Sequence, residues 1–323
     1  MGTKEVKLSH QPSRWPFSRK HNLSQSLPLA SNRLWVIKLH EIPTGYLKLD
    51  GGAMFGVVPK SLWSKINPPD EDNLCTWSMR CLLIETPNRL MLVDTGIGDK
   101  QSERFFSYYQ PHGADSLHKS IEQAGFTPEQ ITDVFLTHLH FDHVGGAVRK
   151  NEKNELIPVF PNATYWSNEK HYDWAVNPNP REKASFLQEN FVPLQRAGVL
   201  AFLPTATSRI QWVDGLQVYF VYGHTEAMML LRIPLGTRHL LYCADLVPSS
   251  GHLGASYVMS YDVRPLLTMQ EKAIILEEAW AAGDILFFEH DPRNACATLT
   301  KDDRGRIVTG ELLSLDEAIR LSQ

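Results

Sequence analysis

Short runs of apolar residues, separated by turns, recur along the chain from Leu34 onward. Runs of about four to eight residues rich in aliphatic and aromatic side chains are typical of buried β-strands. The strands predicted in this way cover residues 34–39, 46–49, 80–85, 89–93, 131–136, 163–166, 199–203, 210–213, 216–222, 228–233, 239–243 and 285–288. Helices are predicted at 116–124, 268–282 and 314–321, with further helical segments after residue 166. Strands that dominate both halves of a chain, with helices between them, can fold as two sheets packed face to face with helices outside.

Residues 1–33 do not share this pattern. They are rich in Ser, Pro, Lys and Arg, show no apolar periodicity and lack the apolar core of a secretory signal. We expect a disordered N-terminal extension over 1–33. Residues 34–323 are expected to form the folded domain.

Composition excludes several classes of partner. The net charge is −4 and there is no Lys/Arg run, so no nucleic-acid partner is expected. No apolar stretch approaches the roughly 20 residues of a membrane span, so no membrane partner is expected. The cysteines show no CxxC spacing and indicate reduced thiols in a cytoplasmic protein; they are Cys75, Cys81, Cys243 and Cys296.

One segment concentrates metal-binding side chains directly after the apolar run 134–136. Residues 137–146 read Thr-His-Leu-His-Phe-Asp-His-Val-Gly-Gly. His138 and His140 are two apart and point the same way on extended backbone, so they can bind one ion together. Asp142 and His143 lie beyond the strand, where the chain turns, and suit a second ion nearby. Imidazole and carboxylate ligands without a thiolate favour zinc.

Histidine and carboxylate residues also follow other predicted strands. Asp94 follows the strand at 89–93, His224 follows 216–222, and Asp245 follows 239–243. His290 comes after the strand at 285–288. In the predicted fold these strand ends lie in one row along a cleft.

Together these residues resemble the metallo-β-lactamase superfamily, whose fold is an α/β, four-layer αββα sandwich. The resemblance covers about residues 34–291 and implies the ligand sets. One zinc ion would bind His138, His140 and His224, and a second would bind Asp142, His143 and His290, with Asp245 bridging the two. Asp94 is expected to hold a histidine of the cluster or a loop in place.

Within that superfamily the chain looks most like the N-acyl homoserine lactonases, other quorum-quenching lactonases and methyl parathion hydrolase. The resemblance implies a zinc-dependent hydrolase that cleaves a lactone or ester by attack of a metal-bridging hydroxide, with Asp142 passing the proton to the leaving group. One departure is Pro248, where the typical homoserine lactonases place a tyrosine. A phosphotriesterase-type hydrolase, a glyoxalase II-like thioesterase and an iron-bound redox protein stay open as alternatives.

Several further residues are candidates for binding the substrate. Apolar walls for an acyl chain or ring are expected from Met54, Phe55, Phe105 and Phe106. Tyr222 and His252, together with Tyr257, are candidates for the hydrogen-bond donor that Pro248 cannot supply. The expected partner is a small-molecule ester or lactone, and a homodimer stays open.

Overall fold

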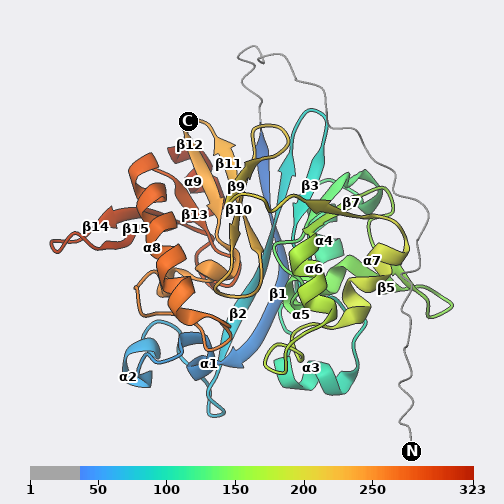
Figure 1. The fold of residues 1–323 in the computed structure, drawn as a ribbon, viewed down its shortest axis with the longest axis horizontal. Helices are drawn as coiled ribbons and strands as arrows, with labels where there is room; N and C mark the ends of the chain where they lie inside the picture. Colours follow the sequence, from blue (N-terminus) through green and yellow to red (C-terminus); the bar gives the residue numbers. More distant parts are fainter. Residues whose placement is uncertain (1–36) are drawn as a thin grey trace, which may run out of the picture. The chain divides into compact units, whose positions relative to one another are not determined.

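The computed structural model describes residues 37–323, which contain two large β-sheets packed face to face (Figure 1). The predicted extension at 1–33 lies outside the described residues. The six-stranded sheet has the order β1 (Lys38–Asp50), β2 (Leu74–Glu85), β3 (Leu90–Val93), β4 (Asp133–Phe135), β7 (Thr164–Asn168), β8 (Leu200–Leu203). The seven-stranded sheet has the order β15 (Ile307–Leu313), β14 (Cys296–Lys301), β13 (Ile285–Phe287), β12 (Arg238–Tyr242), β11 (Met228–Leu235), β10 (Gln217–Val221), β9 (Arg209–Gln211). A small hairpin pairs β5 (Val148–Lys150) with β6 (Leu156–Pro158).

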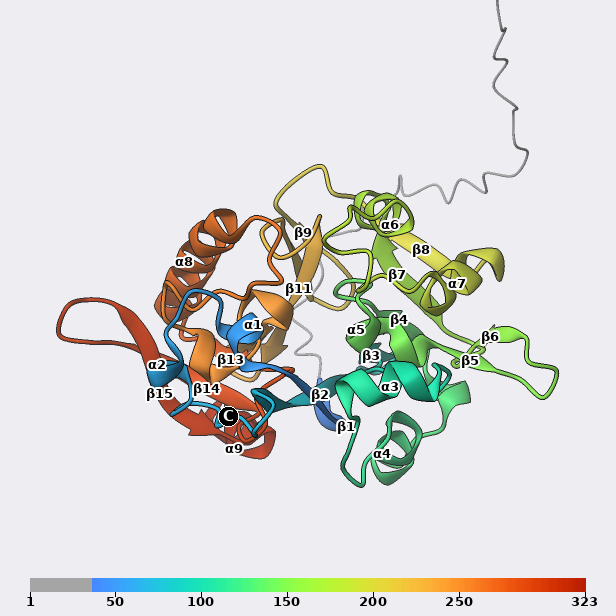
Figure 2. The same ribbon diagram turned by 90° about the horizontal axis from the view of Figure 1, so that it is seen from below.

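Helices cover the outer face of each large sheet (Figure 2). On the six-stranded sheet these are α4 (Leu117–Gln123), α6 (Glu169–Val176) and α7 (Val192–Arg196). On the seven-stranded sheet they are α8 (Pro265–Ala282) and α9 (Leu315–Leu321). Shorter helices lie at strand ends and in loops: α1 (Gly51–Phe55), α2 (Lys60–Trp63), α3 (Glu103–Tyr109) and α5 (Phe141–Val144). The predicted four-layer αββα sandwich is confirmed.

The alternation of side chains along β2 shows how the layers are held together. Leu82 and Ile84 face the core between the two sheets, whereas Leu83 faces the core beneath the helices. Adjacent residues of a strand point to opposite faces, so a strand buried on both faces contributes to both cores. The short central strand β4 is buried throughout and places the metal-binding segment at its end.

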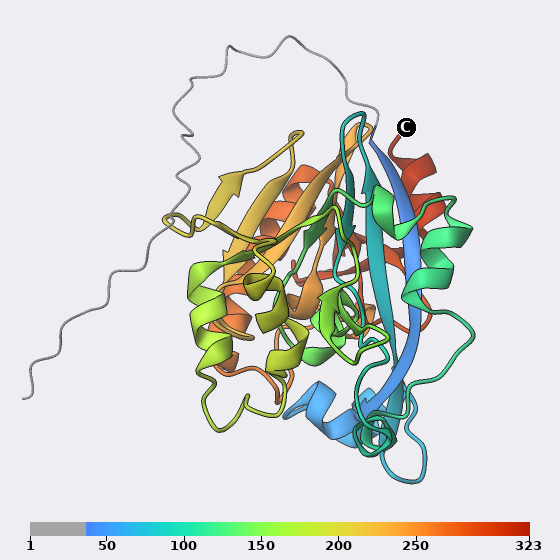
Figure 3. The ribbon, with the colours of Figure 1, turned by 90° about the vertical axis from the view of Figure 1, so that its right-hand side faces the viewer.

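The N-terminal strands differ from the sequence prediction. A single strand, β1, replaces the predicted pair at 34–39 and 46–49, and it runs beside β2 along the sheet (Figure 3). A break in register between Pro43 and Tyr46 contains Gly45, whose φ of 99° favours glycine. The glycine-containing segment after β1 forms the helical turn α1, whose first turn is capped by the Asp50 side chain, which accepts a hydrogen bond from the backbone N–H of Ala53 at 2.7 Å.

Two further features concern the membrane and redox predictions. Within residues 37–323, no helix is long and apolar enough to span a membrane. All four cysteines are buried free thiols.

Candidate metal centre

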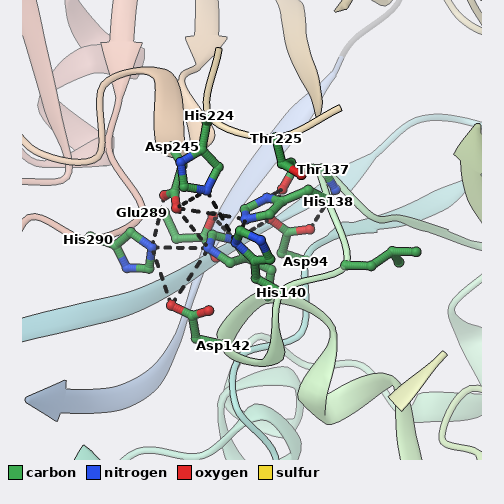
Figure 4. Close-up of polar contacts among 12 residues, drawn as sticks. Asp94, Thr137, His138, His140, Asp142, His224, Thr225, Asp245, Glu289 and His290 are labelled. Atoms are coloured by element: carbon green, nitrogen blue, oxygen red, sulfur yellow. Dashed lines mark hydrogen bonds and ion pairs between the residues drawn. The ribbon is translucent and has the colours of Figure 1, made fainter. Parts of the chain in front are cut away.

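The ends of strands from both sheets bring the predicted ligands to one place (Figure 4). His138 and His140 follow β4, and Asp142 and His143 lie on α5, the helical turn that comes next. From the other sheet come residues that follow β10, β12 and β13, namely His224, Asp245 and His290. These side chains form two potential metal-binding groups.

The first group consists of three histidines and one carboxylate. His138 Nε2 lies 3.1 Å from His140 Nδ1, and His140 Nδ1 lies 3.2 Å from His224 Nε2. The carboxylate oxygen Oδ2 of Asp245 lies 3.1 Å from His224 Nε2. Two donor atoms bound to one tetrahedral zinc ion lie about 3.3 Å apart, given zinc–nitrogen distances of about 2.0–2.1 Å. The spacing of the first group fits such an ion.

The second group shares Asp245 with the first. Nε2 of His143 lies 3.2 Å from Nε2 of His290, and Asp142 Oδ2 lies 3.8 Å from each. Asp245 Oδ1 is 3.1 Å from His290 Nε2, while its Oδ2 is 3.6 Å from His143 Nε2. One carboxylate thus reaches both groups, in the position predicted for a bridging ligand (Figure 4).

The hydrogen bonding and charge of the cluster also fit metal ions. Asp245 Oδ1 is buried and makes no hydrogen bond within the described part of the chain. Burial lowers the pKa of His138 well below its usual value, which favours the neutral imidazole that a metal needs. Burial also tends to lower the pKa of His224, but the Asp245 and Asp262 carboxylates outweigh this effect and raise the pKa of His224 to about 10. A metal ion binding there must therefore displace a proton, so its affinity rises with pH.

Asp94 supports the cluster from the end of β3, as predicted. Its carboxylate accepts hydrogen bonds from Thr137 N at 2.8 Å and from Thr137 Oγ1 at 2.6 Å. Its Oδ2 also lies 3.1 Å from His143 Nδ1, on the far side of the ring from the metal-facing nitrogen. Asp94 has a φ of 58°, a left-handed conformation that is uncommon outside glycine. The buried carboxylate thus fixes the start of the ligand segment and the orientation of one histidine.

Three more carboxylates lie beside ring nitrogens of the cluster histidines, and the sequence did not assign them. Asp262 Oδ1 lies 2.6 Å from His224 Nδ1, and Glu289 Oε2 lies 3.1 Å from His143 Nδ1. Glu182 Oε1 lies 3.6 Å from His140 Nε2. Glu289 directly precedes the ligand His290, so its position was a usable signal. Asp262 and Glu182 lie in irregular segments whose path the strand pattern does not predict.

Close backbone packing explains the two glycines after the ligand segment. A Cβ atom on Gly145 would lie 2.1 Å from the carbonyl oxygen of Ile97. On Gly146 it would lie 2.2 Å from the carbonyl oxygen of Thr95. No side chain fits at either position, so the loop after β3 can lie directly against the turn that carries Asp142 and His143.

Replacing Asp262 by asparagine tests its support of His224. We expect Asp262→Asn to lower zinc affinity about tenfold, because carboxylates that orient metal-binding histidines typically contribute about 10–100-fold. The measurement is competition for zinc against a chromophoric chelator. Asp173→Asn, an exposed position on α6, serves as the control and should leave affinity unchanged. Equal zinc affinity of Asp262→Asn and the unmodified protein would contradict the role assigned to Asp262.

A cavity of about 180 Å³ opens beside the cluster. It reaches five of the predicted ligand residues, namely His140, Asp142, His224, Asp245 and His290. Its remaining lining consists of apolar side chains, two tyrosines, a serine and an arginine: Leu49, Met54, Phe141, Ala184, Met259, Tyr109, Tyr261, Ser185 and Arg181.

Of the predicted substrate residues, Met54 is the one that lines this cavity. Phe55 is fully buried and stacks on His252 with ring centroids 4.6 Å apart. His252 Nε2 lies 2.9 Å from the Met54 carbonyl oxygen and its Nδ1 lies 2.7 Å from Ser249 Oγ, so both ring nitrogens have protein partners. The ring of Phe105 packs edge-on against Phe141, which itself lines the cavity.

The other two candidates also lie outside the cavity lining. Phe106 packs against Phe105 on α3. Tyr222 lies at the end of β10, where its backbone N–H donates to Glu271 Oε1 at 2.7 Å. The cavity lining therefore gives no support to the substrate roles predicted for five residues, namely Phe55, Phe105, Phe106, Tyr222 and His252.

Comparison with known proteins agrees with this geometry. The metallo-beta-lactamase superfamily model matches residues 80–269, which is more than half of the chain. An N-acyl homoserine lactonase of Bacillus cereus is 31% identical over 121 residues, covering 34% of this chain and 44% of the lactonase. The match therefore spans less than half of that relative.

Two solved structures share the fold over most of their length. A probable metal-dependent hydrolase from Staphylococcus aureus has a TM-score of 0.76 and 26% identity, with 86% of this chain and 98% of that chain covered. AidC, described as a dizinc quorum-quenching lactonase, has a TM-score of 0.69 and 21% identity, with 86% and 95% covered. At that identity AidC supports the fold alone. With the family model, the fold and the clustered histidine and aspartate ligands in agreement, this chain is a metallo-hydrolase that belongs to the metallo-beta-lactamase superfamily.

Proposed function

We propose that this protein hydrolyses carboxylic esters or lactones with two bound zinc ions. The observation that carries the proposal is the position of Asp245, whose carboxylate lies 3.1 Å from a histidine of each group beside an open cavity. The first ion would be held by His138, His140 and His224, and the second by Asp142, His143 and His290. When bound, such ions polarise a carbonyl and lower the pKa of bound water to about 7.

The residues of the cavity suit an ester in two ways. Asp142 is the ligand with room to act on the substrate, since its carboxylate lines the cavity at 3.8 Å from each neighbouring histidine nitrogen. It can therefore pass a proton to the leaving oxygen. Apolar contacts for the substrate come from Met54, Phe141 and Met259. Such a wall excludes water around a bound acyl group.

Two tyrosines supply the donor that is missing at Pro248. Tyr109 and Tyr261 line the cavity, and neither hydroxyl group is hydrogen-bonded to a side chain or backbone group of residues 37–323. Burial raises the pKa of both phenols, and the Asp142 carboxylate adds to this rise. Both phenols are therefore protonated at neutral pH and can donate to a substrate oxygen. We assign them this role in place of Tyr222, Tyr257 and His252.

A hydrolysis panel tests the proposal. The substrates are homoserine lactones with short and long acyl chains, aryl esters, a phosphotriester, a β-lactam and a glutathione thioester. We expect a lactone or ester to lead with kcat/KM of at least about 10⁴ M⁻¹s⁻¹, the lower end of ordinary enzyme efficiency. If the phosphotriester or the thioester had the highest kcat/KM, that class of substrate would replace the ester in the proposed function. Iron as the metal of protein purified without added zinc, together with no hydrolysis at all, would favour a redox protein.

A further inference from the structure

Arg181 is the one lysine or arginine that lines the cavity formed by described residues. Its side chain is exposed and forms no ion pair with any carboxylate of residues 37–323. One terminal nitrogen, Nη2, donates to the carbonyl oxygens of Ser260 and Asp262. The other donors, on Nε and Nη1, have no partner within the same residues. The guanidinium group thus keeps spare donors and an unneutralised charge at the cavity.

The arginine is held in place from both ends. Its backbone N–H donates to Asn179 Oδ1 at 2.9 Å, and the following residue, Glu182, is buried. Glu182 accepts hydrogen bonds from Thr225 Oγ1 at 2.6 Å and from Trp174 Nε1 at 2.8 Å, which anchors the segment. Because both the backbone and Nη2 of Arg181 are held, a ligand that binds the remaining donors restricts few additional rotatable bonds of this side chain.

The surroundings of Arg181 favour an anionic partner. Ser185 and Tyr261, which also line the cavity, offer hydroxyl donors, and most of the lining outside the histidine and aspartate cluster is apolar. The acidic side chains of the cavity, Asp142 and Asp245, are engaged with the histidine cluster. Two zinc ions with these two aspartates would leave a positive centre, and Arg181 adds to it. Such a cavity attracts anions.

We propose that the natural substrate carries an anionic oxygen group in addition to its scissile ester, and that Arg181 binds this group. The inference rests on the proposed ester hydrolysis and narrows its substrate class to charged esters or lactones. The free Nε and Nη1 donors lie on different edges of the guanidinium plane, so each can donate one charged hydrogen bond to an oxygen of a carboxylate or phosphate. Arg181 therefore determines specificity and takes no part in bond cleavage.

A matched pair of substrates tests the proposal. The first is the p-nitrophenyl monoester of glutaric acid, which has a free carboxylate, and the second is p-nitrophenyl pentanoate, which is neutral and of similar length. We expect Arg181→Met to lower kcat/KM for the charged ester about 10–100-fold, the range of a charged hydrogen bond, with less than about a twofold change for the neutral one. Arg181→Lys should recover part of the loss, since it keeps the positive charge without the planar set of donors.

Lys183→Met is the control, because Lys183 is an exposed cation two residues away that does not line the cavity. It should leave the ratio of the two kcat/KM values unchanged. If Arg181→Met lowers both esters equally, Arg181 only holds the loop at Ser260 and the proposal is wrong. An effect of Lys183→Met as large as that of Arg181→Met would also overturn it, since the preference would then reflect general surface charge.

Binding to the metal-loaded protein gives a readout that does not depend on turnover. Calorimetric titration with pentanoate, glutarate and phosphonobutanoate compares a single carboxylate with a second carboxylate or a phosphonate. We expect the doubly anionic ligands to bind about tenfold more tightly than pentanoate, and Arg181→Met to remove the difference. Whichever of glutarate and phosphonobutanoate binds more tightly shows whether Arg181 prefers a carboxylate or a phosphonate. Equal affinity for all three ligands would overturn the anion site. If the protein binds glutarate through Arg181 but hydrolyses neither ester, only the ester assignment is wrong.

Discussion

Removal of divalent metal ions should abolish hydrolysis, lowering turnover by at least about three orders of magnitude, because the activation of water would be lost. Seven side chains point their metal-capable atoms at two shared positions, and the buried Asp245 Oδ1 has no hydrogen-bond partner among residues 37–323. The measurement combines metal analysis with turnover of the best panel substrate, before and after chelation. Close to two equivalents of metal are expected before chelation.

The same treatment should lower thermal stability. Ions that bind only the folded chain stabilise it by about 4 kcal/mol at a thousandfold excess over their Kd. Adding zinc back should restore both the melting temperature and the turnover, which separates loss of the ions from irreversible damage. A chelated protein that contains less than a tenth of an equivalent of metal and still turns over at full rate would contradict the metal-dependent mechanism.

The sequence predicted which side chains lie together because local geometry determines much of the cluster. His138, His140, Asp142 and His143 lie within six residues, so one strand end and one helical turn place all four. The remaining ligands each follow a strongly apolar strand, and the αββα fold brings such strand ends together. Asp94 was identifiable by the same rule, since it follows β3 directly.

Side chains that depend on irregular segments were beyond the sequence pattern. Asp262 and Glu182 contact His224 and His140 from loops, and no hydrophobic period predicts where a loop passes. Arg181 reaches the cavity through the same loop as Glu182. The hairpin of β14 and β15 was also missed, because several residues of β15 are exposed and its apolar alternation is weak.

The substrate residues show where apolar composition misleads. Phe55 resembles a cavity wall in the sequence, because it lies in a glycine-rich segment where an exposed ring would be costly. In the fold it is instead enclosed by core aromatics, with Trp63 stacked at 5.6 Å. A buried ring and a ring that lines a pocket have the same sequence signal. The distinction came only from the position of α1 relative to the cavity.

Replacing Asp245 by asparagine should lower kcat by at least about 100-fold, since supporting groups at metal sites alone contribute about 10–100-fold. The change keeps the size of the side chain and removes the one negative charge that lies 3.1 Å from both His224 and His290. The second metal should be lost more readily than the first, because it has two histidines and Asp142 where the first has three histidines. KM should change much less than kcat, since the lost interactions belong to the reacting oxygens and not to the bound ester.

Asp133→Asn is the matched control for this change, because Asp133 is also a buried aspartate but lies at β4, where it accepts hydrogen bonds from Arg89 and Trp166 at 2.8 Å. It should lower the melting temperature while leaving metal content and kcat of the folded protein near their original values. Metal analysis and steady-state kinetics on both variants separate a bridging ligand from a structural carboxylate. If Asp245→Asn kept two bound metals and near-normal kcat, Asp245 could not be the bridge, and the two-ion mechanism would lose the observation on which it rests.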